Sequence, residues 1–370
     1  METHYLDNAA TTRVSDVAAA AVLDAMTVRF GNPSSVHSLG VEAERMNEGA
    51  RSDIAAALGC LPGELIFTSG GTESDNMAII RGAELAAKRG GHGHVVTSLA
   101  EHDAVINSVK YLESRGFEVS WLRPDSDGSV SPEALEAVLR PDTALVSLML
   151  VNNETGAPSQ IDELVRVTRR AAPQALFHTD AVQAFMKHRF TVRSLGVDML
   201  SVSSHKIHGP KGAGALYLRR GVRLKPLILG GGQEHGLRSG TEATPVVAGF
   251  AAAVREAAAE IDRNIERVGM LAERLCSGLE RIPGVEIIAA NGAIVNFAVP
   301  RYPSEVTIRM LEQTGVFVSG GSACARGRAS HVLEAMGVER RLVQSAIRAS
   351  ISWKNTEEDV DALLSAVGGL

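Results

Sequence analysis

The chain has 370 residues, of which 45% are hydrophobic and 22% charged, as expected for one large globular domain with a smaller second one. The formal net charge of -6 argues against stable binding to nucleic acid or to an anionic membrane surface. Three scattered cysteines exclude a disulfide framework, and no apolar stretch is long enough to span a bilayer, so we expect a cytoplasmic protein.

Short apolar runs alternate with amphipathic segments between residues 64 and 218. Such regular alternation of strand and helix predicts a mostly parallel, seven-stranded sheet that is covered on both faces. The predicted strands are 64–68, 94–98, 117–122, 143–150, 176–179, 198–203 and 214–218, with helices at 72–88, 102–115, 132–140 and 161–171.

The pattern changes near residue 230. Residues 242–279 are rich in helix formers and predict one or two long helices. Strands near 285–288 and 294–298, a helix at 304–314 and a terminal helix from Thr356 complete a smaller α+β domain. The N-terminal segment, with a helix near 14–28, is expected to pack with it. We assign 13–250 to the large domain, and 1–12 and 251–370 to the small domain.

Polar clusters follow four of the predicted strands, at 68–72, 152–154, 178–180 and 203–206. Ligands of doubly wound sheets bind beyond the carboxyl ends of the strands. We therefore expect the four clusters to converge on one site. The first cluster contains Gly70, Gly71 and Thr72, which suit an anion site at a helix start, although Thr72 followed by Asp75 also resembles an ordinary capping box.

Lys206 leaves an apolar strand and enters a turn bounded by glycine and proline. A lysine inside a pocket can lose its proton and form a Schiff base with an aldehyde cofactor, although most loop lysines are solvated. Asp180 directly follows another predicted strand, 176–179. It could pair with a protonated pyridine nitrogen, or serve as a turn or helix cap.

Cys324 lies in a small, polar segment with Arg326 and Arg328 nearby, which favours a reactive thiolate. The alternative, a buried and inert thiol, fits Cys60 and Cys276 better. Arg348 projects from an apolar, strand-like run, where it is either a carboxylate clamp or a strand-edge arginine. His92 and His94 have no further ligands at a recognisable spacing, so no metal site is predicted.

Taken together, the motifs resemble the cysteine desulfurase family, in the class V aminotransferase group of fold-type I pyridoxal-phosphate enzymes. The resemblance covers nearly the whole chain, from Tyr5–Thr12 to Ile347–Arg348. The intervening motifs are TSGGTESDN at 68–76, VNNETG at 151–156, HTDAVQ at 178–183, SSHKIHGPKGAGALY at 203–217, GGGQEHGLRSGTE at 230–242 and SGGSACARG at 319–327. It implies the type I α/β fold of pyridoxal-phosphate-dependent transferases, with a large and a small domain.

The resemblance implies pyridoxal 5'-phosphate as cofactor, with Lys206 as the Schiff-base lysine, and it assigns a role to each matching residue. Asp180 is similar to the partner of the pyridine nitrogen, Gln183 to the residue near the ring oxygen, and His102 to the histidine that stacks on the ring and moves protons. The phosphate cradle matches Gly71, Thr72, Ser203 and His205, with Thr241 from a second subunit, which implies a homodimer.

For the substrate, the resemblance implies that Asn153 and Arg348 contact the cofactor and the carboxylate of L-cysteine. Cys324 matches the residue that receives sulfur as a persulfide, leaves L-alanine as product and passes the sulfur to a protein acceptor. The acceptor, in iron–sulfur cluster assembly or a thiolation pathway, stays open, because the segment from Cys324 to Leu333 is slightly short and no long tail follows Trp353. The alternatives are a selenocysteine lyase, another class V enzyme, or a catalytically idle partner-binding protein.

Overall fold

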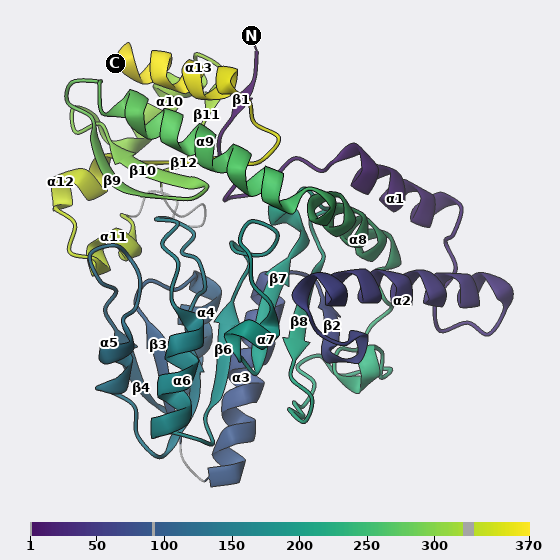
Figure 1. Cartoon of the computed structure of the whole chain (residues 1–370). Helices are drawn as coiled ribbons and strands as arrows, with labels where there is room; N and C mark the ends of the chain where they lie inside the picture. Colours follow the sequence, from purple (N-terminus) through teal and green to yellow (C-terminus); the bar gives the residue numbers. More distant parts are fainter. Residues whose placement is uncertain (1, 91–92, 321–328) are drawn as a thin grey trace.

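The computed structural model describes residues 2–90, 93–320 and 329–370, and its centre is a seven-stranded sheet (Figure 1). The strand order is β2-β8-β7-β6-β5-β3-β4. Four neighbouring pairs are parallel and the two that involve β8 are antiparallel, so the expected mostly parallel sheet is confirmed. The strands are β2 (Leu65–Thr68), β3 (His94–Ser98), β4 (Glu118–Leu122), β5 (Thr143–Ser147), β6 (Leu176–Asp180), β7 (Met199–Ser203) and β8 (Gly214–Leu218).

Both faces of this sheet are buried. Leu145 and Val146 are neighbours in β5 and enter different apolar clusters, because successive side chains point to opposite faces of a strand. The cluster around Leu145 includes residues of α3 (Gly71–Gly90) and α4 (Asp103–Ser114). The cluster around Val146 includes residues of α5 (Pro132–Glu136), α6 (Ile161–Ala171), α7 (Val192–Leu195) and α8 (Thr244–Ala259). Double burial explains why the central strands are nearly continuous apolar runs.

Two N-terminal helices pack against α8 (Figure 1). They are α1 (Asp16–Thr27) and α2 (Ser38–Leu58). The expectation that the helix near 14–28 packs with the small domain is wrong, because Ala18 of α1 joins the core of the large sheet. The sequence of α1 is rich in alanine, so it does not show clearly which face of the helix is buried. The sequence analysis made no prediction for α2, which ends at Gly59 in the left-handed conformation typical of a helix C-terminus.

A second apolar core contains Leu6, Leu275, Phe297, Ile347 and Leu363. It lies between antiparallel strands in the order β12-β10-β9, a parallel pair β1-β11, and several helices. These elements are β1 (His4–Tyr5), β9 (Glu286–Asn291), β10 (Ile294–Ala298), β11 (Val316–Phe317), β12 (Ala346–Ser350), α9 (Ile261–Leu279), α10 (Ser304–Glu312) and α13 (Glu357–Gly368). Two short helices, α11 (His331–Ala335) and α12 (Arg340–Ser345), pack with Ala346 in a separate small cluster. The predicted helical stretch 242–279 therefore forms two helices, α8 and α9, on different cores.

The segment after β1 connects the two cores. The side chain of Asn8 donates to the carbonyl of Ser350 in β12 (2.8 Å), and the Thr12 N–H donates to the carbonyl of His205 after β7 (2.9 Å). Residues 9 and 10 are thereby held over the end of β7. Within the described parts of the chain, no helix combines the length and the apolar character that a membrane crossing requires.

Candidate active site

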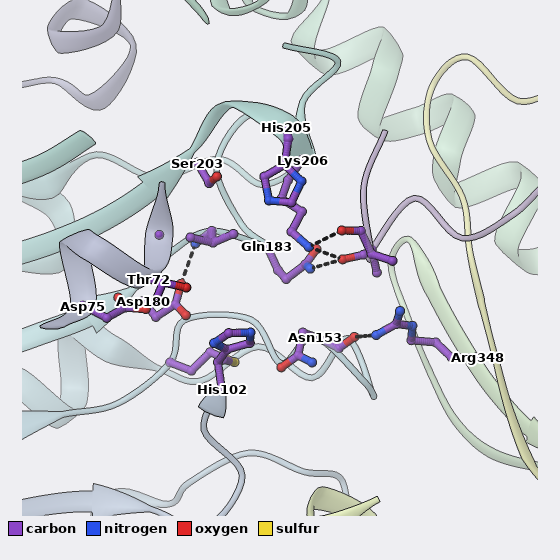
Figure 2. A pocket seen from close by; sticks show the side chains of 15 residues that line it. Thr72, Asp75, His102, Asn153, Asp180, Gln183, Ser203, His205, Lys206 and Arg348 are labelled. Carbon is purple, nitrogen blue, oxygen red and sulfur yellow. Dashed lines mark hydrogen bonds between the residues drawn. The ribbon is translucent and has the colours of Figure 1, made fainter. Parts of the chain in front are cut away.

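A pocket of about 260 Å³ lies beyond the carboxyl ends of the parallel strands (Figure 2). Most of the residues proposed from the sequence line it, and the four polar clusters converge as expected. The lining residues are Ala9, Ala10, Gly71, Thr72, Asp75, His102, Met149, Asn153, Asp180, Val182, Gln183, Ser203, His205, Lys206 and Arg348. The chemical roles that the sequence analysis gave to them stay predictions.

Lys206 ends a short 3-10 helix, η2 (Ser204–Lys206), that follows β7. Its side chain points into the pocket, where Nζ donates to the carbonyl oxygens of Ala9 (2.5 Å) and Ala10 (2.8 Å) (Figure 2). The surroundings are those of an enclosed amine and not of a solvated loop lysine. Sequence analysis missed the two alanines, because small side chains give no signal when the backbone makes the contact.

Carboxylates form one wall of the pocket. Asp180 ends β6, and its Oδ1 accepts the N–H of Val182 (2.8 Å). Burial raises the pKa of Asp180, while His102 and Lys206 act in the opposite direction. Burial also raises the pKa of Asp75 well above its usual value, with the charge of Asp180 adding to the shift. A positively charged ring nitrogen of a bound ligand would stabilise the ionised forms of these neighbouring carboxyl groups.

The sequence analysis considered Asp75 only as a capping residue and gave no role to Glu101, a buried acid that does not itself line the pocket. Asp75 Oδ1 is buried and has no hydrogen-bond partner among the residues that the structure describes. Glu101 accepts from Ser98 and from the N–H of Met149, and burial raises its pKa to about 8. The only available signal was the position of each acid next to a polar cluster, in the first turns of α3 for Asp75 and after β3 for Glu101.

The start of helix α3, beside the acidic wall, suits an anion. Helix α3 begins at Gly71, and a Cβ atom there would lie 2.7 Å from Val182 Cγ2, so any side chain at this position would displace Val182. The buried Ser203 Oγ has no partner within the described residues. The capping-box alternative for Thr72 and Asp75 is wrong: both line the pocket, and the Glu73 carboxylate accepts the N–H of Ser69 (2.8 Å) instead. A helix N-terminus with a free hydroxyl is a site for a phosphate.

His205 and His102 face the pocket from η2 and from the start of α4. Burial and neighbouring lysines lower the pKa of His205 to about 3, and its Nδ1 lies 3.1 Å from Thr11 Oγ1. His102 Nδ1 accepts the N–H of Ala104 (3.1 Å), which assigns the proton of the neutral ring to Nε2. The amine, the acids and the anion site together fit the expected pyridoxal phosphate, with its aldehyde, ring nitrogen and phosphate.

Arg348 projects from β12 into the pocket and is only 1% exposed. Its Nη1 donates to the Asn153 carbonyl (2.8 Å) and its Nη2 to Asp7 Oδ1 (3.0 Å). Arg348 Nε and Asn153 Oδ1 are buried without partners in the part of the chain that the structure describes. A guanidinium in this position can bind a substrate carboxylate.

Two proposed residues are not among those that line the pocket. Thr241 is exposed, in the loop between a 3-10 helix, η3 (Glu234–Gly236), and α8. Cys324 lies outside the described residues. The chain on either side of it is anchored at the pocket: the Arg348 N–H donates to the Ser319 carbonyl (2.7 Å), and Ser330 Oγ donates to Glu154. Burial raises the pKa of the Cys60 thiol to about 12 and also raises that of Cys276.

The two histidines considered for a metal differ in position. His92 lies outside the described residues. His94 is buried in β3, with hydrogen bonds to Thr143 and Ser120. No group of three or more metal-ligating side chains is found in the described residues.

The chain is similar to known proteins over nearly its whole length. The family described as aminotransferase class-V matches residues 4–363. A protein named cysteine desulfurase IscS from Methanosarcina thermophila is 41% identical over 98% of this chain and 90% of its own length. A cysteine desulfurase from Gluconacetobacter diazotrophicus is 42% identical over 100% and 94%. A solved NifS-like protein is 39% identical, covers 100% of this chain and 99% of its own, and superposes with a TM-score of 0.94.

Proposed function

The chain belongs to the class-V aminotransferase family, whose members depend on pyridoxal phosphate, and is a cysteine desulfurase; from this premise we propose that its pocket binds pyridoxal phosphate through Lys206 and converts L-cysteine to L-alanine. One observation carries the proposal. The Lys206 amine points into a pocket that is lined by buried carboxylates and by the N-terminus of helix α3.

Each part of the cofactor would meet a suitable group. Asp180 would pair with the ring nitrogen, Gln183 would face the ring oxygen, and His102 would cover the ring. The phosphate would lie on the residues Gly71, Thr72, Ser203 and His205. When bound, pyridoxal phosphate supplies an electron sink that stabilises negative charge on the substrate α-carbon.

Lys206 and His102 would have different tasks in proton transfer. The carbonyls of Ala9 and Ala10 hold the Lys206 nitrogen in place, so that its lone pair, once the proton has left, can accept the α-proton of the substrate. His102 uses Nδ1 as an acceptor for its own helix and presents Nε2–H to the pocket. His102 is therefore the hydrogen-bond donor of the pair.

The substrate carboxylate would pair with the Arg348 guanidinium beside Asn153. Cys324 is five residues from the anchored Ser319, so covalent geometry allows it to lie up to roughly 17 Å away. The Cys324 thiolate would form an S–S bond with the substrate sulfur while the substrate C–S bond breaks. The electron pair of that bond stays on the carbon, which takes a proton and leaves as alanine, and the persulfide sulfur then passes to a protein acceptor of iron–sulfur assembly or thiolation.

Reconstitution tests the proposal. The purified protein should turn yellow on addition of pyridoxal phosphate, with a visible absorption band, and should then release alanine and sulfide in equal amounts from L-cysteine and a thiol reductant. A protein that stays colourless would instead favour the idle partner-binding alternative. Fractionation of cells should find the protein in the cytoplasm.

We propose a homodimer in which Thr241 of one copy completes the phosphate site of the other. Exposed apolar side chains support it: Val36 is 98% and Leu229 80% exposed, and Met26 and Phe30 are also exposed. Light scattering should give twice 39.1 kDa. Thr241→Ala should weaken cofactor affinity about 10-fold while the dimer persists, through loss of one phosphate contact. A 39.1 kDa particle with full cofactor affinity contradicts this arrangement.

A further inference from the structure

Lys187 lies behind the pocket and has no part in the chemistry proposed above. It follows β6 by seven residues, and its Nζ donates to Oε1 of Gln183 (3.0 Å). Among the described residues no ion pair between Lys187 and a carboxylate is found, and no acidic group contributes to the shift of its pKa. Burial, with the positive charges of Lys206 and Arg348, lowers the pKa of Lys187 to about 7. A partly buried cation without an acidic partner is unfavourable unless its position has a use.

The backbone at this point is strained. Met186 has a φ of 58°, in the left-handed region that methionine rarely adopts. The N–H groups of Lys187 and His188 both donate to the Ala184 carbonyl, at 3.0 and 2.9 Å, so the chain makes a tight turn. That turn directs Lys187 back toward Gln183. Strained residues persist where the surrounding structure fixes them, and they are concentrated near functional sites.

The Gln183 amide has only one orientation compatible with its partners. A carbonyl oxygen can only accept hydrogen bonds, and the Lys187 amine can donate one whether it is charged or neutral. Lys187 must therefore face Oε1, and the Ala9 carbonyl must face Nε2, which donates to it at 2.9 Å. The same Ala9 carbonyl accepts from Lys206 (Figure 2). Because Gln183 lines the pocket, the second N–H of Nε2 is the polar group that it can offer to a ligand.

We infer that Lys187 is a positioning residue, which holds the Gln183 amide so that it presents an N–H donor to the ring oxygen of the bound cofactor. This inference rests on the proposed function and adds to it a residue outside the pocket. The ring oxygen of pyridoxal phosphate carries negative charge, and a donor there forms a charge-assisted hydrogen bond. Without Lys187 only the contact with the Ala9 carbonyl holds the amide, so its oxygen turns toward that charge more often.

The test uses equilibrium cofactor affinity, measured on the apoprotein by dialysis or fluorescence quenching. Lys187→Met keeps the length of the side chain, and the neighbouring apolar cavity of about 320 Å³, lined by Met186, Val268, Ile351 and Trp353, tolerates a methionine. We expect pyridoxal phosphate to bind about 10-fold more weakly, through loss of one buried hydrogen bond. In a Gln183→Ala background the same change should alter affinity less than about twofold, because the group that it positions is gone.

A cofactor analogue separates positioning from a general structural role. For pyridoxal phosphate that lacks the ring hydroxyl, the wild type and Lys187→Met should bind with equal affinity. Lys110→Met, an exposed lysine of α4, matches the change in charge and should have no effect. If Lys187→Met does not fold, Lys187→Leu takes its place with the same expectation. An equal loss for both cofactors, or in both Gln183 backgrounds, overturns the inference, whereas a wild type that binds no cofactor overturns the proposed function itself.

Discussion

Cys324→Ala should bind pyridoxal phosphate with the affinity of the wild type, yet form alanine from L-cysteine at least roughly 1,000-fold more slowly. The thiolate at this position is the proposed acceptor of the substrate sulfur, and alanine cannot replace it. Cofactor binding should persist because the residues proposed to hold the ring and phosphate lie elsewhere, around Lys206 and at the start of α3. Absorbance of the reconstituted protein and chromatographic assay of alanine measure the two properties separately.

The other two cysteines are matched controls. Cys60→Ala and Cys276→Ala should leave turnover unchanged, because the raised pKa values keep these thiols protonated at neutral pH. Mass spectrometry of the wild type after brief exposure to L-cysteine should find the additional sulfur atom on the peptide that contains Cys324. Undiminished turnover in Cys324→Ala would exclude the persulfide route, and undiminished turnover of selenocysteine alone would favour the lyase alternative.

Lys206→Ala should abolish both the covalent attachment of the cofactor and the reaction, with a rate loss of at least about 10,000-fold. The same amine is proposed as the anchor of the aldehyde and as the acceptor of the α-proton, so no second group is positioned to take over both tasks. Borohydride reduction of the reconstituted wild type, followed by peptide mapping, should find the cofactor on Lys206. The variant treated in the same way should carry none.

Two other lysines, Lys211 and Lys187, are alternative sites of cofactor attachment that this experiment can distinguish from Lys206. Lys211 is exposed five residues further along, and Lys211→Ala should retain the covalent cofactor and activity. Lys187 is a more serious competitor, because its lowered pKa makes its amine reactive near neutral pH. Its hydrogen bond to Gln183 Oε1 holds that amine away from the aldehyde. Cofactor trapped on Lys187 or Lys211 in the wild type would refute the assignment of Lys206.

Much of the candidate site follows from local sequence. Apolar runs predicted the strands, and the polar residues after them, such as Asp180, Asn153 and Lys206, had to converge because parallel strands end at the same edge of a sheet. Gly71 was likewise informative, because a glycine before a predicted helix indicates close approach of the backbone to another group. These features depend on strand direction and on backbone space, which local residue types determine.

Contacts between distant segments required the folded chain. The carbonyls of Ala9 and Ala10 reach Lys206 only because residues 7–12 are bonded both to β12 and to the turn after β7. The packing of α1 on α8 was also not predicted. The alanine-rich sequence of α1 has no distinct apolar face that would identify its partner.

The sequence by itself determined the sheet and the positions of the polar clusters, and it was sufficient to propose Lys206 as the reactive amine. Only the tertiary structure decided which backbone groups hold that amine, that Asp75 joins Asp180 in the acidic wall, and that Lys187 fixes the orientation of Gln183. The physical reason is that hydrogen bonds and desolvation act over a few ångströms in space. Residues far apart in sequence acquire them only when packing brings them together.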